Sequence, residues 1–436
     1  MNYDQTIEFL FGSLPMYQRI GDAAIKKDLT NIRLLCSLLE EPQQKFSCIH
    51  VAGTNGKGST SHMLAAVFQA AGKKVGLYTS PHYVDFRERI KINGKKISEK
   101  AVVNFVKSWS EKWQKIQPSF FEITVAMAFD YFRNEKVDIA IIETGLGGRL
   151  DSTNIIHPLL SVITNIGYDH MQLLGNTLPE IAFEKAGIIK KNIPVIIGEW
   201  QNETAEIFKK KAGNEDAPIH FAAKHIALDH AAGNLFKHTY HIKMRSGKWI
   251  GKIESDLTGP YQLKNIRTVL EALWCWNKYY PDRRISGAQI KNGLKDVKES
   301  TSMIGRWMVI REKPIVIADA AHNIDGIKSI LPDLLKISAN RRHFVLGFVA
   351  DKDIKKILSL FPADGHYYWC SPDIPRGKPA LETMMTGRDI GLRGDHFGSV
   401  KSAYHVALGN ASKKDLVFVG GSSYVVGDFL AEMNKK

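Results

Sequence analysis

From Phe46 onward, the hydrophobic positions of the chain follow two alternating patterns. Short runs rich in β-branched residues alternate with longer stretches in which apolar residues recur every three or four positions, as at Met63, Leu64, Val67 and Phe68. The short runs predict β-strands and the longer stretches predict amphipathic helices. This alternation is typical of a parallel sheet with helices on both faces, so the sequence predicts a doubly wound α/β protein.

The first half of the chain contains most of the predicted parallel strands. They are the apolar runs 46–52, 75–79, 137–142, 160–164 and 193–198. A capping box of Thr177 and Glu180, with a proline in its first turn, predicts the start of a helix that carries Lys185 on a later turn.

The pattern changes between residues 219 and 258, where apolar and polar residues alternate around a turn signal at Ser246-Gly247. This predicts a small antiparallel β subdomain, followed by a helix over 266–279. Segment 297–304 is polar and has no periodicity, which favours a linker. A second α/β unit is predicted beyond it, with strands at 315–318, 344–348, 367–370 and 416–419 and a helix at 324–335. We therefore expect two domains, 1–297 and 298–436, the second smaller and Rossmann-like.

Charge and composition narrow the class of protein. The 436 residues include 59 Lys and Arg against 45 Asp and Glu, a net charge of +14, which favours anionic ligands such as nucleotides and polycarboxylates. The alternative is that these lysines are spread over solvated surfaces. No Cys/His finger spacing or basic–aromatic interleaving is present, so we expect no nucleic-acid partner.

The compartment is predicted from the chain's start and from its cysteines. Asp4 and Glu8 replace a basic leader region, and no run of about 20 apolar residues occurs, so we expect neither a signal peptide nor a membrane span. The four cysteines are far apart and form no CxxC pair, which favours free thiols in a reducing cytoplasm. No exposed apolar stripe stands out, and we expect a monomer.

The strongest local signal for chemistry is the glycine-rich turn 53–59, GTNGKGS, between a predicted strand and a predicted helix. Backbone N–H groups of such a turn, backed by a helix N-terminus, can bind phosphate oxygens, and Lys57 can neutralise their charge. The turn matches neither GxxxxGK[ST] nor GxGxxG. A merely structural glycine turn is the alternative, and the position of Lys57 counts against it.

Other polar residues are predicted to gather beside this turn. Glu143 follows a buried strand, and loops 79–82 and 165–170 follow two more. In an open α/β sheet, ligands bind outside the carboxyl ends of the strands. An acidic residue placed there beside a phosphate loop can hold Mg²⁺. His170 taken alone could equally be an ordinary loop histidine.

These motifs carry a resemblance to a known family. The stretches 50–59 (HVAGTNGKGS) and 141–156 (IIETGLGGRLDSTNII), together with TSPH at 79–82, resemble the folylpolyglutamate synthase/dihydrofolate synthase family of the Mur ligase superfamily. The resemblance implies a Mur-ligase-type ATP-binding domain over 1–297 and a glutamate-binding ligase domain over 298–436. Two features depart from the family pattern: Ala320 stands where a glycine is usual, and Met303-Ile304 precedes Gly305-Arg306 in place of Trp-Pro.

The resemblance also implies roles for particular residues. The catalytic residues would be Lys57, Glu143, His170 and Lys185. ATP would contact Asn55, Gly56, Lys57, Gly58, Ser59, Asn265, Arg306 and Asp319. One Mg²⁺ would be held by Ser80 and Glu143 and a second by Glu143, His170 and Lys185, a lysine whose counterpart in the family is carbamylated. The pterin and glutamate substrates would be bound by Ser80, Pro81, His82, Phe120, Phe121, Glu122, Leu150, Asp151, Ser152 and His322.

The implied activity is an ATP-dependent ligation of L-glutamate to a folate or pteroate carboxylate through an acyl phosphate, with dihydropteroate and tetrahydrofolate both candidate acceptors. A Mur-type peptidoglycan ligase, a P-loop ATPase without a covalent product and a basic nucleic-acid-binding protein are the alternatives. The TSPH loop counts against the P-loop ATPase. Steep salt dependence of affinity would be the mark of nucleic-acid binding.

Two further features are given structural interpretations, and a third is left open. His225, His230, His238 and His241 do not make a metal site, because His238 and His241 would point to opposite faces of a strand. Trp109 and Trp113 lie four apart on a predicted helix and are expected to pack. The turn 420–423 opens a helix after a strand and is either an anion site or a plain tight turn.

Overall fold

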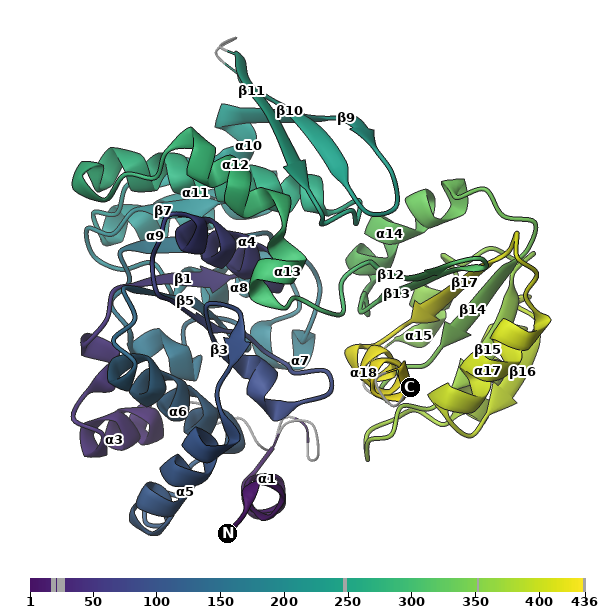
Figure 1. The fold of residues 1–436 in the computed structure, drawn as a ribbon, viewed down its shortest axis with the longest axis horizontal. Helices are drawn as coiled ribbons and strands as arrows, with labels where there is room; N and C mark the ends of the chain where they lie inside the picture. Colours follow the sequence, from purple (N-terminus) through teal and green to yellow (C-terminus); the bar gives the residue numbers. More distant parts are fainter. Residues whose placement is uncertain (17–20, 22–27, 246–248, 351–352, 434–436) are drawn as a thin grey trace. The chain divides into compact units, whose positions relative to one another are not determined.

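The computed structural model of the chain describes residues 1–16, 21, 28–245, 249–350 and 353–433 (Figure 1). The chain divides into two compact units. The first comprises Met1–Pro81, Phe86–Leu257 and Gln262–Met303, and the second comprises His82–Asp85, Thr258–Tyr261 and Ile304–Lys436. Each unit is built on its own sheet with its own hydrophobic core.

The first unit contains an eight-stranded sheet with the order β4-β3-β2-β5-β1-β6-β7-β8. Its strands are β1 (Cys48–Ala52), β2 (Val75–Tyr78), β3 (Ile90–Ile92), β4 (Lys95–Lys96), β5 (Ile139–Glu143), β6 (Leu160–Ile163), β7 (Val195–Ile197) and β8 (Ile219–Phe221). The six strands other than β3 and β4 run parallel, with Val51 of β1 opposite Glu143 of β5. The predicted parallel α/β sheet is thus confirmed, and its strands are apolar runs because helices cover both faces.

Helices of the first unit surround this sheet. They are α1 (Tyr3–Ser13), α3 (Thr30–Leu38), α4 (Lys57–Ala70), α5 (Glu99–Trp113), α6 (Phe120–Asn134), α7 (Met171–Leu174), α8 (Leu178–Ala186), α9 (Asn202–Asn214), α10 (Ala222–His225), α11 (Gln262–Tyr279), α12 (Gly287–Lys295) and α13 (Val297–Thr301). The predicted capping box of Thr177 and Glu180 is present at the start of α8. Trp113 is buried and packs on Phe105, so the packing role predicted for it is confirmed.

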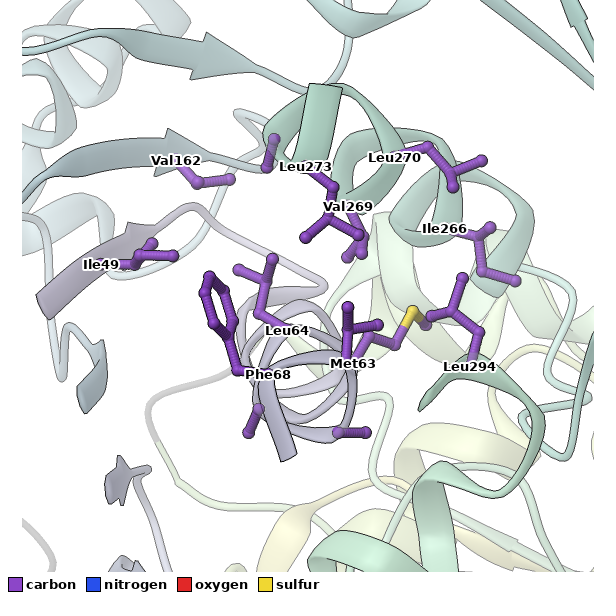
Figure 2. Packing of buried hydrophobic residues seen from close by; sticks show 14 of the residues in the cluster. Ile49, Met63, Leu64, Phe68, Val162, Ile266, Val269, Leu270, Leu273 and Leu294 are labelled. Atoms are coloured by element: carbon purple, nitrogen blue, oxygen red, sulfur yellow. The ribbon is translucent and has the colours of Figure 1, made fainter. Parts of the chain in front are cut away.

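Helix α4 is buried on nearly every side, which holds the preceding glycine turn in place. Leu64 and Phe68 face Ile49 of β1 and Val162 of β6, while Met63 lies toward α11 and α12 (Figure 2). At Gly293 of α12, a Cβ atom would lie 2.4 Å from the Cα of Val67, so the two helices approach too closely for any side chain.

A three-stranded antiparallel sheet, β11-β10-β9, completes the first unit and confirms the predicted antiparallel subdomain. Its strands are β9 (Ile226–Gly233), β10 (His238–Met244) and β11 (Trp249–Ser255). The turn expected at Ser246-Gly247 lies outside the described residues. The predicted start of this subdomain at residue 219 is wrong, because residues 219–221 form β8, which pairs parallel to β7 in the large sheet.

The segment 297–304, predicted as a linker from its lack of periodicity, begins with helix α13. The backbone N–H groups of Val297 and Lys298 donate to the carboxylate of Asp256, at 3.0 and 2.8 Å. The residue that caps this five-residue helix is therefore remote in sequence, and local periodicity could not reveal it.

The second unit contains a six-stranded sheet with the order β12-β13-β17-β14-β15-β16. Its strands are β12 (Met308–Glu312), β13 (Ile315–Asp319), β14 (Arg342–Leu346), β15 (His366–Cys370), β16 (Gly394–Phe397) and β17 (Leu416–Gly420). Its helices are α14 (Ile324–Lys336), α15 (Ile354–Leu358), α16 (Ala380–Arg388), α17 (Val400–Asn410) and α18 (Ser423–Met433). β12 pairs antiparallel and the other strands pair parallel. The four predicted strands are confirmed, and the two edge strands β12 and β16 were missed.

Two further expectations concern features of the whole chain. All four cysteines are free thiols, as predicted, and all four are buried. Across the described ranges, no helix has the length and apolarity needed to cross a bilayer.

Candidate functional site

The glycine turn leads from β1 into α4 with a backbone that only glycine adopts without strain. Gly53 has φ +145° and Gly56 has φ +86°. A Cβ atom on Gly53 would lie 1.8 Å from Thr164 Oγ1, and one on Gly56 would lie 2.3 Å from Asn265 Oδ1. These contacts explain the glycines at both positions, because positive φ and close approach each exclude a side chain.

Hydrogen bonds from the loop after β6 hold the turn in this shape. Thr54 N donates to Asn165 O at 2.9 Å, and Asn55 N donates to Asn165 Oδ1 at 2.9 Å. Thr164 Oγ1 donates to Asn55 O at 2.6 Å. The turn delivers the chain to the N-terminus of α4, where backbone N–H groups lack intrahelical partners and favour anions.

Two lysines converge on the carbonyl oxygen of Gly53. Lys57 Nζ, from the first residue of α4, donates to Gly53 O at 3.0 Å and to Thr54 O at 3.2 Å. Lys185 Nζ, from α8, donates to the same Gly53 O at 3.0 Å. Lys185 is 3% exposed, and burial together with the charge of Lys57 lowers its pKa to about 7. The site therefore places two amines at the turn, and the proximity of Lys57 disfavours the charged form of Lys185.

Glu143 places a carboxylate against the same helix start. It ends β5, is 4% exposed, and accepts a hydrogen bond from Ser80 N at 3.2 Å. A Cβ atom on Gly58 would lie 3.8 Å from both carboxylate oxygens, so Glu143 borders the first turn of α4. The structure brings together Ser80, Glu143, Lys57 and the turn, as the sequence predicts.

His170 lies on the loop that follows β6 and begins α7. Its φ is +49°, and its Nε2 lies 3.9 Å from Asp169 Oδ2. The same loop supplies Asn165 to the glycine turn. His170 thus belongs to the carboxyl edge of the sheet, and its role as a metal ligand stays a prediction.

The residues expected to bind the pterin fall into two groups. At the start of α6, Phe120 is buried in the core beside Phe86, and Glu122 Oε2 accepts from Ser119 N at 2.7 Å in a capping box. Phe121 is partly buried, and a Cβ atom on Gly145 would lie 2.4 Å from its Cζ. These contacts give Phe120 and Glu122 structural roles, whereas Phe121 borders the 145–148 loop.

The second group is the turn after that loop. Asp151 caps the short helix Ser152–Ile155, accepting from Thr153 N at 3.0 Å, and also accepts from Leu146 N at 2.8 Å. Burial raises the pKa of Asp151, although these donors oppose the shift. Leu150 is half-buried and Ser152 is buried. Asp151 therefore shapes the 145–151 loop from within.

In the second unit, Asp319 ends β13 and is fully engaged in internal hydrogen bonds. Its Oδ2 accepts from Tyr261 Oη at 2.6 Å and from Trp307 N at 2.7 Å, and its Oδ1 accepts from Ala321 N at 2.8 Å. Arg306 Nη1 donates to Tyr83 Oη at 2.7 Å. Asp319 and Arg306 thus order the 305–307 turn, and their nucleotide contacts stay predictions.

The remaining predicted residues fall on different elements. His322 Nδ1 donates to Ala320 O at 3.0 Å in the loop after β13. Pro81 closes the first unit's loop after Ser80, and His82 belongs to the second unit. Asn265 lies on α11 beside Gly56, and its Nδ2 donates to Gln262 Oε1 at 2.9 Å.

Two residues at this site were not foreseen. Gln262 Nε2 donates to Ser59 Oγ at 3.2 Å, which connects α11 to the glycine turn. Thr144 Oγ1, next to Glu143, is buried and has no hydrogen-bond partner among the residues that the structure describes. The sequence offered a signal for both residues. Gln262 lies one helical turn before Asn265, and Thr144 directly follows Glu143 in its motif.

Comparison with known proteins assigns this architecture. Residues 51–273 match the Mur ligase middle domain, and residues 305–423 match the Mur ligase glutamate ligase domain. The chain is 32% identical to a folylpolyglutamate synthase of Lacticaseibacillus casei, over 98% of this chain and 97% of that relative. It is 36% identical to a dihydrofolate synthase/folylpolyglutamate synthase of Bacillus subtilis, over 82% of this chain and 84% of that relative.

Solved structures agree with this similarity. FolC of Escherichia coli in complex with DHPP and ADP is 27% identical, with a TM-score of 0.86 over 100% of this chain and 98% of that chain. A bifunctional enzyme of Yersinia pestis complexed with AMPPNP and Mn ion is 26% identical, with a TM-score of 0.84 and the same coverage. The chain belongs to the folylpolyglutamate synthase/dihydrofolate synthase family of Mur ligases.

Proposed function

We propose that this chain is an ATP-dependent ligase that joins the amine of L-glutamate to a folate or pteroate carboxylate, and that it accepts both dihydropteroate and tetrahydrofolate. Relatives named dihydrofolate synthase/folylpolyglutamate synthase support the reaction class, as does a solved relative holding DHPP and ADP. The observation that carries the proposal is the convergence of Lys57 and Lys185 on Gly53 O, with the Glu143 carboxylate bordering the same helix start.

The first chemical step uses the positive charge of Lys57. The substrate carboxylate attacks the γ-phosphorus of ATP, the bond to the bridging oxygen breaks, and ADP leaves with both electrons of that bond. Lys57 and the N–H groups at the start of α4 stabilise the negative charge on the transferring phosphoryl group. In the second step the neutral amine of glutamate attacks the acyl carbon, phosphate leaves, and the amine loses a proton.

The residues present fit a divalent metal such as Mg²⁺. Glu143 supplies a buried carboxylate, and the orphaned hydroxyl of Thr144 lies directly beside it in sequence. Hard oxygen donors of this kind suit Mg²⁺. We propose that Ser80 and Glu143 hold one ion and that Glu143, His170 and a modified Lys185 hold another. Bound metal supplies charge neutralisation for phosphoryl transfer.

Carbamylation of Lys185 is part of this proposal. A buried amine whose pKa is about 7 is substantially neutral at physiological pH and can add to CO₂, releasing one proton and forming a carbamate. That reaction replaces a buried cation with an anion suited to metal binding. Lys185→Ala should lose most activity and regain part of it when a small carboxylate such as acetate is added. Absence of any rescue, in a variant that folds and binds ATP, would contradict the modification.

The decisive experiment measures phosphate release from MgATP and glutamate with dihydropteroate, with tetrahydrofolate, and with neither. Release with both acceptors supports a bifunctional enzyme, and release with one acceptor identifies the single step. Release that does not depend on either acceptor, or no release in any arm, contradicts the proposed substrates. Mass spectrometry of the product, with a gain of one glutamate, confirms ligation directly.

We also propose that the enzyme acts as a monomer in the cytoplasm. The net charge of +14 supports this, because a charge far from zero disfavours self-association. Sedimentation velocity at physiological salt tests the state, and a concentration-dependent dimer would contradict it.

A further inference from the structure

Four metal-ligating side chains of the first unit gather outside the site described above. They are His220 on β8, His225 at the end of α10, and Glu271 and Cys275 on α11. Glu271 and Cys275 are four residues apart, so they lie on one face of their helix. The group therefore unites the edge strand of the large sheet, the short helix that leads into the antiparallel sheet, and α11.

The ligand atoms of this cluster lie close to one another. Glu271 Oε1 is 2.7 Å from His225 Nδ1, 3.8 Å from His220 Nδ1 and 3.9 Å from Cys275 Sγ. One ligand atom each from His220, Glu271 and Cys275 can be chosen so that all lie within 4.8 Å of one another. Tetrahedral zinc, with bonds of about 2.0 to 2.3 Å, needs ligand separations of about 3.3 to 3.8 Å. The atoms of His220, Glu271 and Cys275 would each have to move by roughly 1 Å to reach that spacing. His225 lies outside this group of three, and its half-exposed side chain would have to rotate to join them.

Burial makes a bound cation chemically reasonable at this position. Glu271 is 1% exposed and Cys275 is fully buried. A carboxylate and a thiolate in such an environment are costly unless a cation compensates their charge. One divalent ion bound by a carboxylate, a thiolate and two neutral imidazoles makes a neutral site. Two nitrogens, one sulfur and one oxygen form a ligand set that favours zinc over Mg²⁺.

The surroundings orient the histidines and provide access. His220 Nε2 lies 2.9 Å from Tyr279 Oη, and that hydrogen bond leaves Nδ1 directed toward Glu271. An outer hydrogen bond of this kind is the usual support of a metal-binding histidine. The His225 side chain is 43% exposed, which gives an ion a route from solvent.

We propose that His220, Glu271 and Cys275 bind one zinc ion and that His225 completes the tetrahedron from the solvent side. Binding displaces the thiol proton of Cys275 to solvent and changes no oxidation state. The ion would link β8 and α10 to α11, the helix whose first turn carries Gln262 and Asn265 beside the phosphate turn. The site is thus structural, and it is distinct from the metal position at Glu143.

Cobalt titration of the full-length protein tests this proposal. The protein is stripped with a chelator and returned to excess Mg²⁺, and Co²⁺ is then added while absorbance is recorded. We expect one equivalent to bind with the intense visible bands of tetrahedral cobalt and a thiolate-to-cobalt charge-transfer band in the near ultraviolet. The Glu143 site contains no thiol, so this band separates the two positions. Zinc should displace the cobalt.

Matched variants make the result specific. Cys48→Ser is the control, because Cys48 is equally buried in the same unit and only burial acts on its thiol. Cys275→Ser should lose the charge-transfer band, whereas Cys48→Ser should keep it. His225→Ala changes a half-exposed residue and should weaken binding about tenfold or more without unfolding the protein.

Three outcomes would overturn the proposal. The first is a folded wild-type protein that shows no thiolate band, and the second is a band that persists in Cys275→Ser. The third is unchanged affinity in His225→Ala. If Cys275→Ser does not fold, equimolar Zn²⁺ should raise the melting temperature of the wild type and of Cys48→Ser, an effect that Mg²⁺ does not reproduce. Equal shifts with zinc and Mg²⁺ would count against the site.

Discussion

The carboxyl edges of the two parallel sheets are built alike, but they treat buried charge differently. In the first unit, Lys185 is 3% exposed and donates to one backbone carbonyl that it shares with Lys57. In the second unit, Asp319 is 1% exposed and accepts three hydrogen bonds, from Tyr261, Trp307 and Ala321. One charge lies beside another of the same sign, while the other is surrounded by donors.

The difference lies in how each buried charge is compensated: Lys185 lies beside a second lysine, whereas Asp319 accepts hydrogen bonds from its own unit. Like charges in a buried site cost stability unless an anion joins them, and a ligand that carries phosphates would relieve that cost. A carboxylate that accepts several hydrogen bonds stabilises the loops that donate them. If the proposed function is correct, the first unit therefore keeps a destabilising buried charge until phosphates bind. In the second unit, burial also disfavours the charge of Asp319, but the hydrogen bonds that it accepts oppose that effect.

The largest expected effect is on catalysis at the first edge. Lys57→Ala should lower glutamate-dependent ATP turnover by about 10³-fold, because it removes a positive charge from the transferring phosphoryl group. The melting temperature should change little, since the hydrogen bonds of Lys57 to the described residues end on two loop carbonyls. Initial-rate kinetics and calorimetry measure both quantities. Lys73→Ala, an exposed lysine after α4, is the control. Turnover within tenfold of wild type would refute the role of Lys57.

The comparison is sharpest at Lys185, where activity and stability should move in opposite directions. Its folded pKa of about 7 is below the ordinary value of 10.5, so the unfolded chain binds more protons between those limits. Wild-type stability should rise with pH from about 7 to 10.5. Lys185→Met should therefore be inactive yet melt several degrees higher at pH 6, a gain that vanishes by pH 10.5.

Melting curves in bicarbonate-free buffer check this prediction, with the exposed Lys191→Met as the control. A lower melting temperature for Lys185→Met at pH 6 would show that the amine is compensated within the fold, and the contrast between the two edges would fail.

The opposite sign is expected at Asp319. Asp319→Asn removes the negative charge that accepts three hydrogen bonds, and it should destabilise the second unit by about 1 to 3 kcal/mol. Urea denaturation followed by tryptophan fluorescence measures the change. Asp325→Asn, on the exposed first turn of α14, should change stability by about 0.5 kcal/mol or less. If Asp319→Asn left stability unchanged or raised it, the charge of Asp319 would not stabilise the fold, and the contrast with Lys185 would fail.

The last expected effect is confined to acidic pH and concerns two buried histidines. Burial, with a contribution from Lys190, lowers the pKa of His50 on β1 to about 3, and its Nε2 lies 2.9 Å from Thr153 Oγ1. Burial also lowers the pKa of His343 on β14, but Asp415, whose Oδ2 lies 3.5 Å from His343 Nε2, opposes that shift. Below about pH 6.5, His50 is protonated in the unfolded chain but stays neutral in the folded protein, so the free energy of unfolding falls as the pH drops toward 3.

His50→Gln should remove up to about 1.4 kcal/mol per pH unit from this acid slope. His343→Gln should change the slope less, because the carboxylate of Asp415 stabilises the protonated imidazole of His343. Melting temperatures from pH 7 to 4 measure both slopes. Equal changes for the two variants would show that Asp415 does not matter.

The predictability of each strand depended on whether it is covered on both faces. β1, β5, β6, β13 and β17 are buried or nearly so and were evident as apolar runs. β16 is an edge strand with the sequence GDHF and no buried residue, so nothing in its composition distinguishes it from a loop. β8 is only three residues long, and its partner β7 decides its parallel direction.

The site was predictable to a similar extent. Local motifs placed Lys57, Glu143 and Lys185 at strand ends and on a helix, and the rule that ligands bind at carboxyl ends brought them together. The sequence could not show that Tyr261 and Trp307 donate hydrogen bonds to Asp319. Tyr261 lies far from Asp319 in the chain, and the position of Trp307 depends on the turn at 305–307. Nor could the sequence show that His225, His230 and His238 have different partners. The ring centroids of His230 and His238 lie 4.6 Å apart, whereas His225 forms a hydrogen bond with Glu271.

By itself the sequence determined the α/β class, the glycine turn, the capping box at the start of α8 and the family, because each depends on residues close together in the chain. Only the tertiary structure decided which buried charges are compensated and which side chains from separate elements meet. It is long-range packing that brings Lys57 and Lys185 to one carbonyl oxygen and His220 and Cys275 to one carboxylate. Interactions of this kind depend on distance in space, and no local pattern encodes them.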